Sequence, residues 1–185
     1  PLDMSEIPIK PIIRINAKYY CFIIEHLIRN SIPIIESLLS GPEKVKLEYS
    51  KIKGDYFEEK TLFLLGELVD GQSYHSLQYP KRTEIDGIIV KDDVIFLIEV
   101  KGKKRRIIAG ADDILGLTKK DFEAHIGGAF SQTKRAYDYI YSKDEVEFRN
   151  SKGETVLKLR KDDISRIYLV TVSLSSFSEL SLDLN

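Results

Sequence analysis

The stretch that most constrains this chain is EIDGIIVKDDVIFLIEVK, residues 84–101. Two runs rich in Ile, Val and Phe flank a short charged segment, which predicts two strands joined by a tight hairpin turn. If Asp92 and Asp93 are the two turn residues, Asp86 faces Glu99 across the hairpin. Two acids that face each other at the outer end of a hairpin need an explanation.

Side chains alternate along a strand, so Asp86, Glu99 and Lys101 are expected on one face. Like charges directly opposite each other cost up to about 1 kcal/mol on a surface, and partial burial increases the repulsion. A bound divalent cation would reverse its sign. A register slip of one residue would remove the argument. The alternative is that these charges are solvated, with Glu84 paired to Lys101.

Composition limits the function classes. The chain has 185 residues, 43% hydrophobic and 31% charged, which is typical of one globular domain, with or without an appendage. Its net charge of −1 means that nucleic-acid binding would need a local basic patch. The single cysteine, Cys21, allows neither an intrachain disulfide nor a cysteine-based zinc site, which favours the cytoplasm. No signal peptide is recognisable, and the apolar residues 19–28 are too few to span a membrane.

We expect residues 1–48 to form a helical N-terminal extension, with helices at 17–30 and 33–40. Residues 49–185 would form the main domain. Because the sequence starts at Pro1 and not at Met, upstream domains of a longer chain are expected as partners. A homodimer is the other expected arrangement.

The main domain should open with a helix over residues 53–71, with Asp55 as N-cap and Gly71 as stop. Glu58 lies in the apolar stripe of this helix, and Glu59 lies one position round. A carboxylate in such a stripe is stabilised by the helix dipole or reserved for a ligand.

The rest of the chain predicts alternating strands and helices. A strand at 72–79 precedes the hairpin, and a helix at 121–141, weakened at Gly127-Gly128, follows it. A second hairpin at 145–159 and a buried strand at 166–174 complete the order. This order predicts an α/β domain with a central mixed sheet flanked by helices.

Four motifs in this order carry a resemblance: GDYFEE at 54–59, EIDG at 84–87, IEVKG at 98–102 and FSQTKRAYDY at 130–139. Over residues 53–141 the chain resembles the PD-(D/E)XK nuclease superfamily, although Ile85 stands where the motif's proline would be. The resemblance implies a restriction endonuclease-like three-layer core. It also implies a set of catalytic residues: Glu58, with Glu59 as second choice, Asp86, Glu99, Lys101 and Gln132.

The resemblance further implies a nuclease that hydrolyses phosphodiester bonds in DNA with Mg²⁺ or Mn²⁺, in restriction-like defence or in repair; RNA stays open as a substrate. Carboxylates suit such metals. The implied metal ligands are Glu58, Asp86, Glu99 and the Val100 carbonyl. Lys101 would orient or deprotonate the attacking water, or stabilise charge at the phosphate, and Gln132 would position substrate or a ligand.

A basic stretch, KGKKRR at 101–106, follows the acids directly. Basic side chains there and on the second helix could track a phosphate backbone. The nucleic-acid-binding candidates are Lys103, Lys104, Arg105, Arg106, Lys134 and Arg135.

Two other readings compete with the nuclease. The same fold could serve as a catalytically weak or inactive module that docks nucleic acid or protein within a larger machine. Alternatively, the charges could be ordinary surface salt bridges. Metal titration and the stability of Asp86→Asn separate the three readings.

Overall fold

The computed structural model describes residues 12–21, 24–29, 31–39, 41–80, 83–102, 116, 119–120 and 122–174. These residues divide into two compact units whose boundary falls between Ile52 and Lys53. The predicted division of the chain into 1–48 and 49–185 stays a prediction.

The first unit begins with a β-hairpin, followed by helices. Its elements are β1 (Ile12–Ile15), β2 (Lys18–Cys21), α1 (Ile24–Arg29), α2 (Ser31–Leu39) and the first turns of α3 (Glu43–Val69). The helix predicted over 17–30 is therefore wrong at its start, because Lys18–Cys21 form a strand and the helix begins only at Ile24.

The hairpin turn explains this error. Asn16 and Ala17 have φ angles of 47° and 64° between the paired residues Ile15 and Lys18. A two-residue hairpin turn with both φ angles positive is the type I′ turn, for which Asn is a favoured residue and Ala an unusual one. The missing glycine made the hairpin hard to recognise.

Helix α3 also departs from its prediction at the N-terminal end. It begins at Glu43, ten residues earlier than expected, and Asp55 lies inside it instead of capping it. Its C-terminal end is close to the prediction, because Gly71 donates its N–H to the Gly66 carbonyl and Asp70 takes a left-handed φ of 54°. This is a Schellman-type helix end, in which Asp70 occupies the position usually held by glycine.

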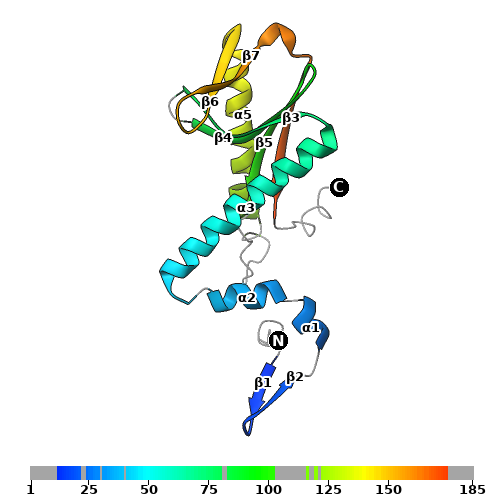
Figure 1. The fold of residues 1–185 in the computed structure, drawn as a ribbon, viewed down its shortest axis with the longest axis vertical. Coiled ribbons are helices and arrows are strands. Elements are labelled where there is room, and N and C mark those ends of the chain that lie inside the picture. Colours follow the sequence, from blue (N-terminus) through cyan, green and yellow to red (C-terminus); the bar gives the residue numbers. More distant parts are fainter. Residues whose placement is uncertain are drawn as a thin grey trace. The chain divides into compact units, whose positions relative to one another are not determined.

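The second unit is built on a six-stranded sheet with the order β7-β6-β3-β4-β5-β8 (Figure 1). Only β5 and β8 are parallel, so the predicted mixed sheet is confirmed. The strands are β3 (Gln72–Tyr79), β4 (Thr83–Lys91), β5 (Val94–Lys101), β6 (Glu145–Arg149), β7 (Thr155–Arg160) and β8 (Arg166–Ser173), with a short 3₁₀ turn, η3 (Lys161–Asp163), before β8.

The central hairpin has the predicted register. Pairs run from Lys91–Val94 to Gly87–Ile98 around the two-residue turn Asp92-Asp93. The predicted second hairpin and final strand are also present, as β6–β7 and β8.

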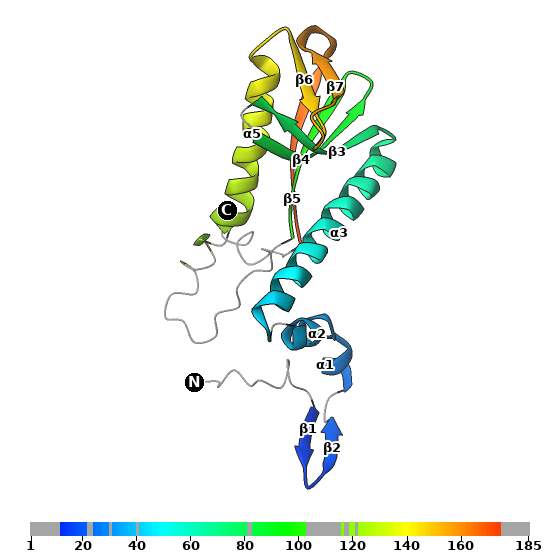
Figure 2. The same cartoon turned by 60° about the vertical axis from the view of Figure 1, so that its left-hand side comes forward.

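Two helices cover the two faces of this sheet (Figure 2). Helix α5 (Gly128–Tyr141) follows a π-helical turn, η2 (Glu123–Gly127), at the glycines where the sequence predicted a weak point. The α5-side cluster consists of Leu77, Tyr79, Ile85, Ile88, Ile95, Leu97, Ala136, Ile140, Val146, Phe148, Leu157 and Leu159. The α3-side cluster consists of Leu62, Ile89, Ile98 and Val100. The predicted three-layer arrangement is confirmed.

No helix among the described residues combines the length and the apolar character needed to cross a membrane.

Candidate active site

The site lies where β4 and β5 stop pairing, at Gly87 and Ile98, although both strands continue beyond this pair. In β4, Ile85 and Ile88 belong to the same α5-side cluster despite being three positions apart. Regular alternation would place them on opposite faces. Strand β4 therefore turns over between these two residues, meaning that its alternation is broken once and the faces to which its side chains point are exchanged.

Strand β5 does not turn over. Leu97 lies in the α5-side cluster and Val100 in the α3-side cluster, as alternation requires, and all of β5 pairs with β8. A strand that turns over cannot keep its ladder with one that does not, because residues paired across a ladder point to the same face. Continued pairing would place the apolar side chains of β4 in the wrong layer. The two strands separate for this reason, and Asp86 lies where they part.

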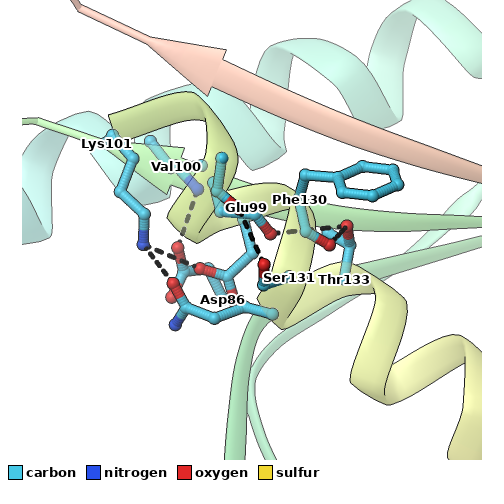
Figure 3. A network of polar contacts seen from close by, with 10 residues as sticks. Asp86, Glu99, Val100, Lys101, Phe130, Ser131 and Thr133 are labelled. Atoms are coloured by element: carbon cyan, nitrogen blue, oxygen red, sulfur yellow. Dashed lines mark hydrogen bonds and ion pairs between the residues drawn. The ribbon is translucent and has the colours of Figure 1, made fainter. Parts of the chain in front are cut away.

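Asp86 is held in the gap by the backbone of the neighbouring strand. Its Oδ2 accepts a hydrogen bond from the Val100 N–H at 2.7 Å (Figure 3). The prediction that Asp86 shares a face with Glu99 assumed strict alternation, which is broken in β4 at this position. The two carboxylates are nevertheless close enough for Asp86 to raise the pKa of Glu99.

Glu99 is fully buried on β5. Its Oε2 accepts from Lys101 Nζ at 3.0 Å, whereas its Oε1 has no hydrogen-bond partner among the described residues. Burial first, and then the charge of Asp86, raise its pKa from 4.5 to about 7. A buried carboxylate with one unsatisfied oxygen is costly for the protein alone.

Lys101 connects the acids to helix α5. Its Nζ also donates to Gln132 Oε1 at 2.8 Å, so Glu99 and Gln132 fix one ammonium group between them. The Lys101 side chain remains 23% exposed, which leaves it accessible from solvent.

Helix α3 brings a third carboxylate near this group. Burial first, and then the charges of Asp86 and Asp55, raise the pKa of Glu58 from 4.5 to about 7. Glu59 is exposed and lines a separate hollow with Phe63 and His75. Of the two sequence candidates, Glu58 is the one in the field of Asp86.

A metal ion would have to be held mainly by the two strand carboxylates. No three His, Cys, Asp or Glu residues converge on one point in the described part of the chain. The buried Glu99 Oε1 beside a second carboxylate nevertheless fits a hard divalent cation, which prefers oxygen ligands. The resemblance implies a role for the Val100 carbonyl, which stays a prediction; the contact that Val100 forms with Asp86 uses its N–H.

The basic candidates are only partly described. Lys103, Lys104, Arg105 and Arg106 lie outside the described residues. On α5, Lys134 forms an ion pair with Asp138, and Arg135 is exposed. The Arg135 guanidinium also lies near the buried Tyr79 hydroxyl, a neighbour that was not expected from the sequence.

The family model of the nuclease-related domain (NERD) matches residues 53–154, more than half of the chain. The chain belongs to the nuclease-related domain family. This family is part of the restriction endonuclease-like, PD-(D/E)XK superfamily, so the resemblance read from the sequence is confirmed. The matched nuclease-related domain contains all the catalytic candidates, and its fold is the expected one. No curated protein and no solved structure matches the chain.

Proposed function

We propose that this nuclease-related domain is a metal-dependent nuclease that hydrolyses phosphodiester bonds in DNA. The observation that carries the proposal is the fully buried Glu99, whose Oε1 is unpartnered within the described residues and which lies in the field of Asp86. A fully buried carboxylate beside a second, partly buried one is rare in proteins without a cation or a function.

Asp86 and Glu99 would be the main ligands of Mg²⁺ or Mn²⁺, with Glu58 and the Val100 carbonyl completing the set. The bound ion would supply a more acidic water and neutralise charge at the phosphate. Hydrolysis needs both effects, because the nucleophile is water and the leaving group is an oxyanion.

The protein's own groups would orient the reactants. Lys101 Nζ, fixed by Glu99 and Gln132, would hold the attacking water or a phosphate oxygen. The Val100 N–H fixes Asp86 before substrate arrives, which reduces the reorganisation needed during the reaction.

The exposed Arg135 and the basic stretch at 103–106 are the proposed contacts to the nucleic-acid backbone. Lys134 would first have to exchange its ion pair with Asp138 for a phosphate. Such contacts carry no sequence information, so no base sequence is proposed. DNA is the proposed substrate class, with RNA as the comparison. Restriction-like defence or repair in the cytoplasm is the proposed setting.

The test combines metal binding with cleavage. Calorimetric titration of the chain with Mn²⁺ and Mg²⁺ is expected to show binding that Asp86→Ala loses and that Asp162→Ala, an exposed control in η3, retains. Linear, nicked and branched DNA should be cleaved by wild type and by Asp162→Ala, but not by Asp86→Ala or Lys101→Ala. Wild-type cleavage by both active-site variants would rule the proposal out.

One observation favours a second function. Because no three acids converge among the described residues, the domain could dock nucleic acid or protein with weak or no catalysis, alongside upstream domains or a second copy. DNA binding without any divalent-ion binding or cleavage would support this docking module.

A further inference from the structure

Ser76, in the middle of β3, has a left-handed backbone with φ at 48°. It stands opposite Asp86 on β4, yet these two residues do not form a pair in the ladder. The ladder continues in one register on both sides of this position, at His75–Gly87 and Leu77–Ile85. The irregularity is therefore confined to two facing residues.

Strand β3 turns over at Ser76. Tyr74 and Leu77 both pack on the α5 side although they are three positions apart. Ser73 instead faces helix α3, because a Cβ at Gly66 would lie 2.3 Å from the Ser73 Oγ. Strand β4 turns over in the same way between Ile85 and Ile88.

The breaks in alternation in β3 and β4 depend on each other. A strand that turned over alone would present its apolar side chains to the wrong layer or lose its partner's register. Because β3 and β4 turn over at facing positions, their pairing and their burial both survive. Strand β5 does not follow, which is why it parts from β4 at Asp86.

We infer that Ser76 is a positioning residue for Asp86. Its left-handed backbone makes β3 turn over, β4 turns over with it, and Asp86 is directed towards the Val100 N–H. With an ordinary extended backbone at Ser76, β4 would keep regular alternation and continue its ladder with β5. The consequence for cleavage rests on the proposed function, but the consequence for the bond between Asp86 and Val100 does not.

Substitutions at Ser76 should rank by their tolerance of a left-handed backbone. Glycine adopts it freely and asparagine accepts it more readily than most residues, whereas alanine disfavours it and β-branched valine disfavours it most. Ser76 is exposed, so the side chains themselves should have little effect on packing. The order expected is Gly and Asn like Ser, then Ala, then Val.

The direct readout is the Val100 amide in the full chain, by nitrogen–proton NMR and hydrogen exchange. Its chemical shift should change in Asp86→Ala, which identifies the signature of the bond. Ser76→Gly and Ser76→Asn should keep the wild-type signature, and Ser76→Val should lose it while the amides of β6 and β7 stay unchanged. Gln72→Val, at an exposed β3 position, is the matched control and should keep it.

An unchanged Val100 amide in Ser76→Val would overturn the inference. If that variant does not fold, Ser76→Ala decides: it should show an intermediate signature, and a wild-type one would count against the role of Ser76.

Cleavage gives the second readout. Ser76→Val, which displaces Asp86, should lower kcat by about 100-fold with little change in KM. Ser76→Gly should cleave at the wild-type rate. If wild type cleaves no DNA, the proposed function fails while the Val100 amide still tests Ser76.

Discussion

The Asp86 carboxylate accepts the Val100 N–H at 2.7 Å, in the gap that opens where β4 leaves β5. The Asp86 carboxylate thus accepts a main-chain N–H that a strand carbonyl would accept if the ladder continued. This arrangement keeps the carboxylate in place beside Glu99 despite their mutual repulsion.

Replacing Asp86 by asparagine should separate repulsion from hydrogen bonding. The Asn oxygen can still accept the Val100 N–H, but the charge facing Glu99 is gone. We expect Asp86→Asn to be more stable than wild type without metal, by up to about 1 kcal/mol, and to lose cleavage. Urea denaturation in chelator measures this, with Asp162→Asn as control. Unchanged or lower stability would favour ordinary salt bridges.

Stability without metal should fall as pH rises from about 4.5 to about 7. The folded chain holds the Glu99 proton up to about pH 7, whereas the unfolded chain releases it near 4.5. Because the native state binds more protons in this window, the free energy of unfolding decreases with pH and levels off above it. Glu58 contributes with the same sign.

Glu99→Gln should flatten this pH dependence, and Glu145→Gln, at an exposed position in β6, should not. Denaturation midpoints across the pH range provide the measurement. An equal slope in wild type and Glu99→Gln would show that Glu99 ionises normally in the folded chain.

Gln132→Ala should lower cleavage by about tenfold, because the charged donor Lys101 Nζ loses its hydrogen bond to Gln132 Oε1. The fold should survive, since Gln132 is only partly buried. Ser131→Ala, at the preceding residue of α5, is the control, because Ser131 Oγ donates to the Gly127 carbonyl of the adjoining π-helical turn and not to an active-site group. Single-turnover cleavage rates distinguish the two variants.

Glu58→Gln should weaken divalent-ion binding, whereas Glu59→Gln should leave it unchanged. The reason is that Glu58 lies in the field of Asp86 and Glu59 lines a different hollow. Calorimetric titration of both variants compares adjacent residues of one helix. The reverse result would assign the helix carboxylate to Glu59.

Gly87→Ala should destabilise the fold by about 1–3 kcal/mol, because a Cβ at this position would lie 2.2 Å from Leu62 Cδ2. Gly54→Ala is the contrasting variant, since a Cβ there meets nothing within 4 Å. As an interior position of α3, it should gain about 0.5–1 kcal/mol. Chemical denaturation measures both changes, and the pair also tests how α3 packs on β4.

The central hairpin could be predicted with its register because its signals are local. Two apolar runs and the turn Asp92-Asp93 leave one pairing that buries both runs, and this pairing is observed. Local signals also predicted β3 correctly. They failed at Asp55, a plausible N-cap residue that lies inside a helix continuing through it.

The separation of β4 from β5 could not be predicted, because it depends on three strands at once. Its cause involves Ser76, and no residue type announces a left-handed serine inside a strand. The burial of Glu99 and the preference for Glu58 over Glu59 depend on packing between layers in the same way. The sequence supplied the residue types of the candidate site but not the geometry that would make them act together.

The parallel pairing of β5 with β8 has a consequence for the order of folding. The central hairpin closes over a two-residue turn, but β8 joins it over a long loop, as the bond from Ser165, just before β8, to Asp93 shows: the two residues are 72 positions apart. Closing such a long loop carries an entropic cost that local pairing avoids. During synthesis the chain makes Asp86 and Glu99 long before β8, the strand that pairs beside Glu99 in the finished sheet. We therefore expect Asp86 and Glu99 to stay hydrated through early folding, with their repulsion increasing as the later elements bury Glu99.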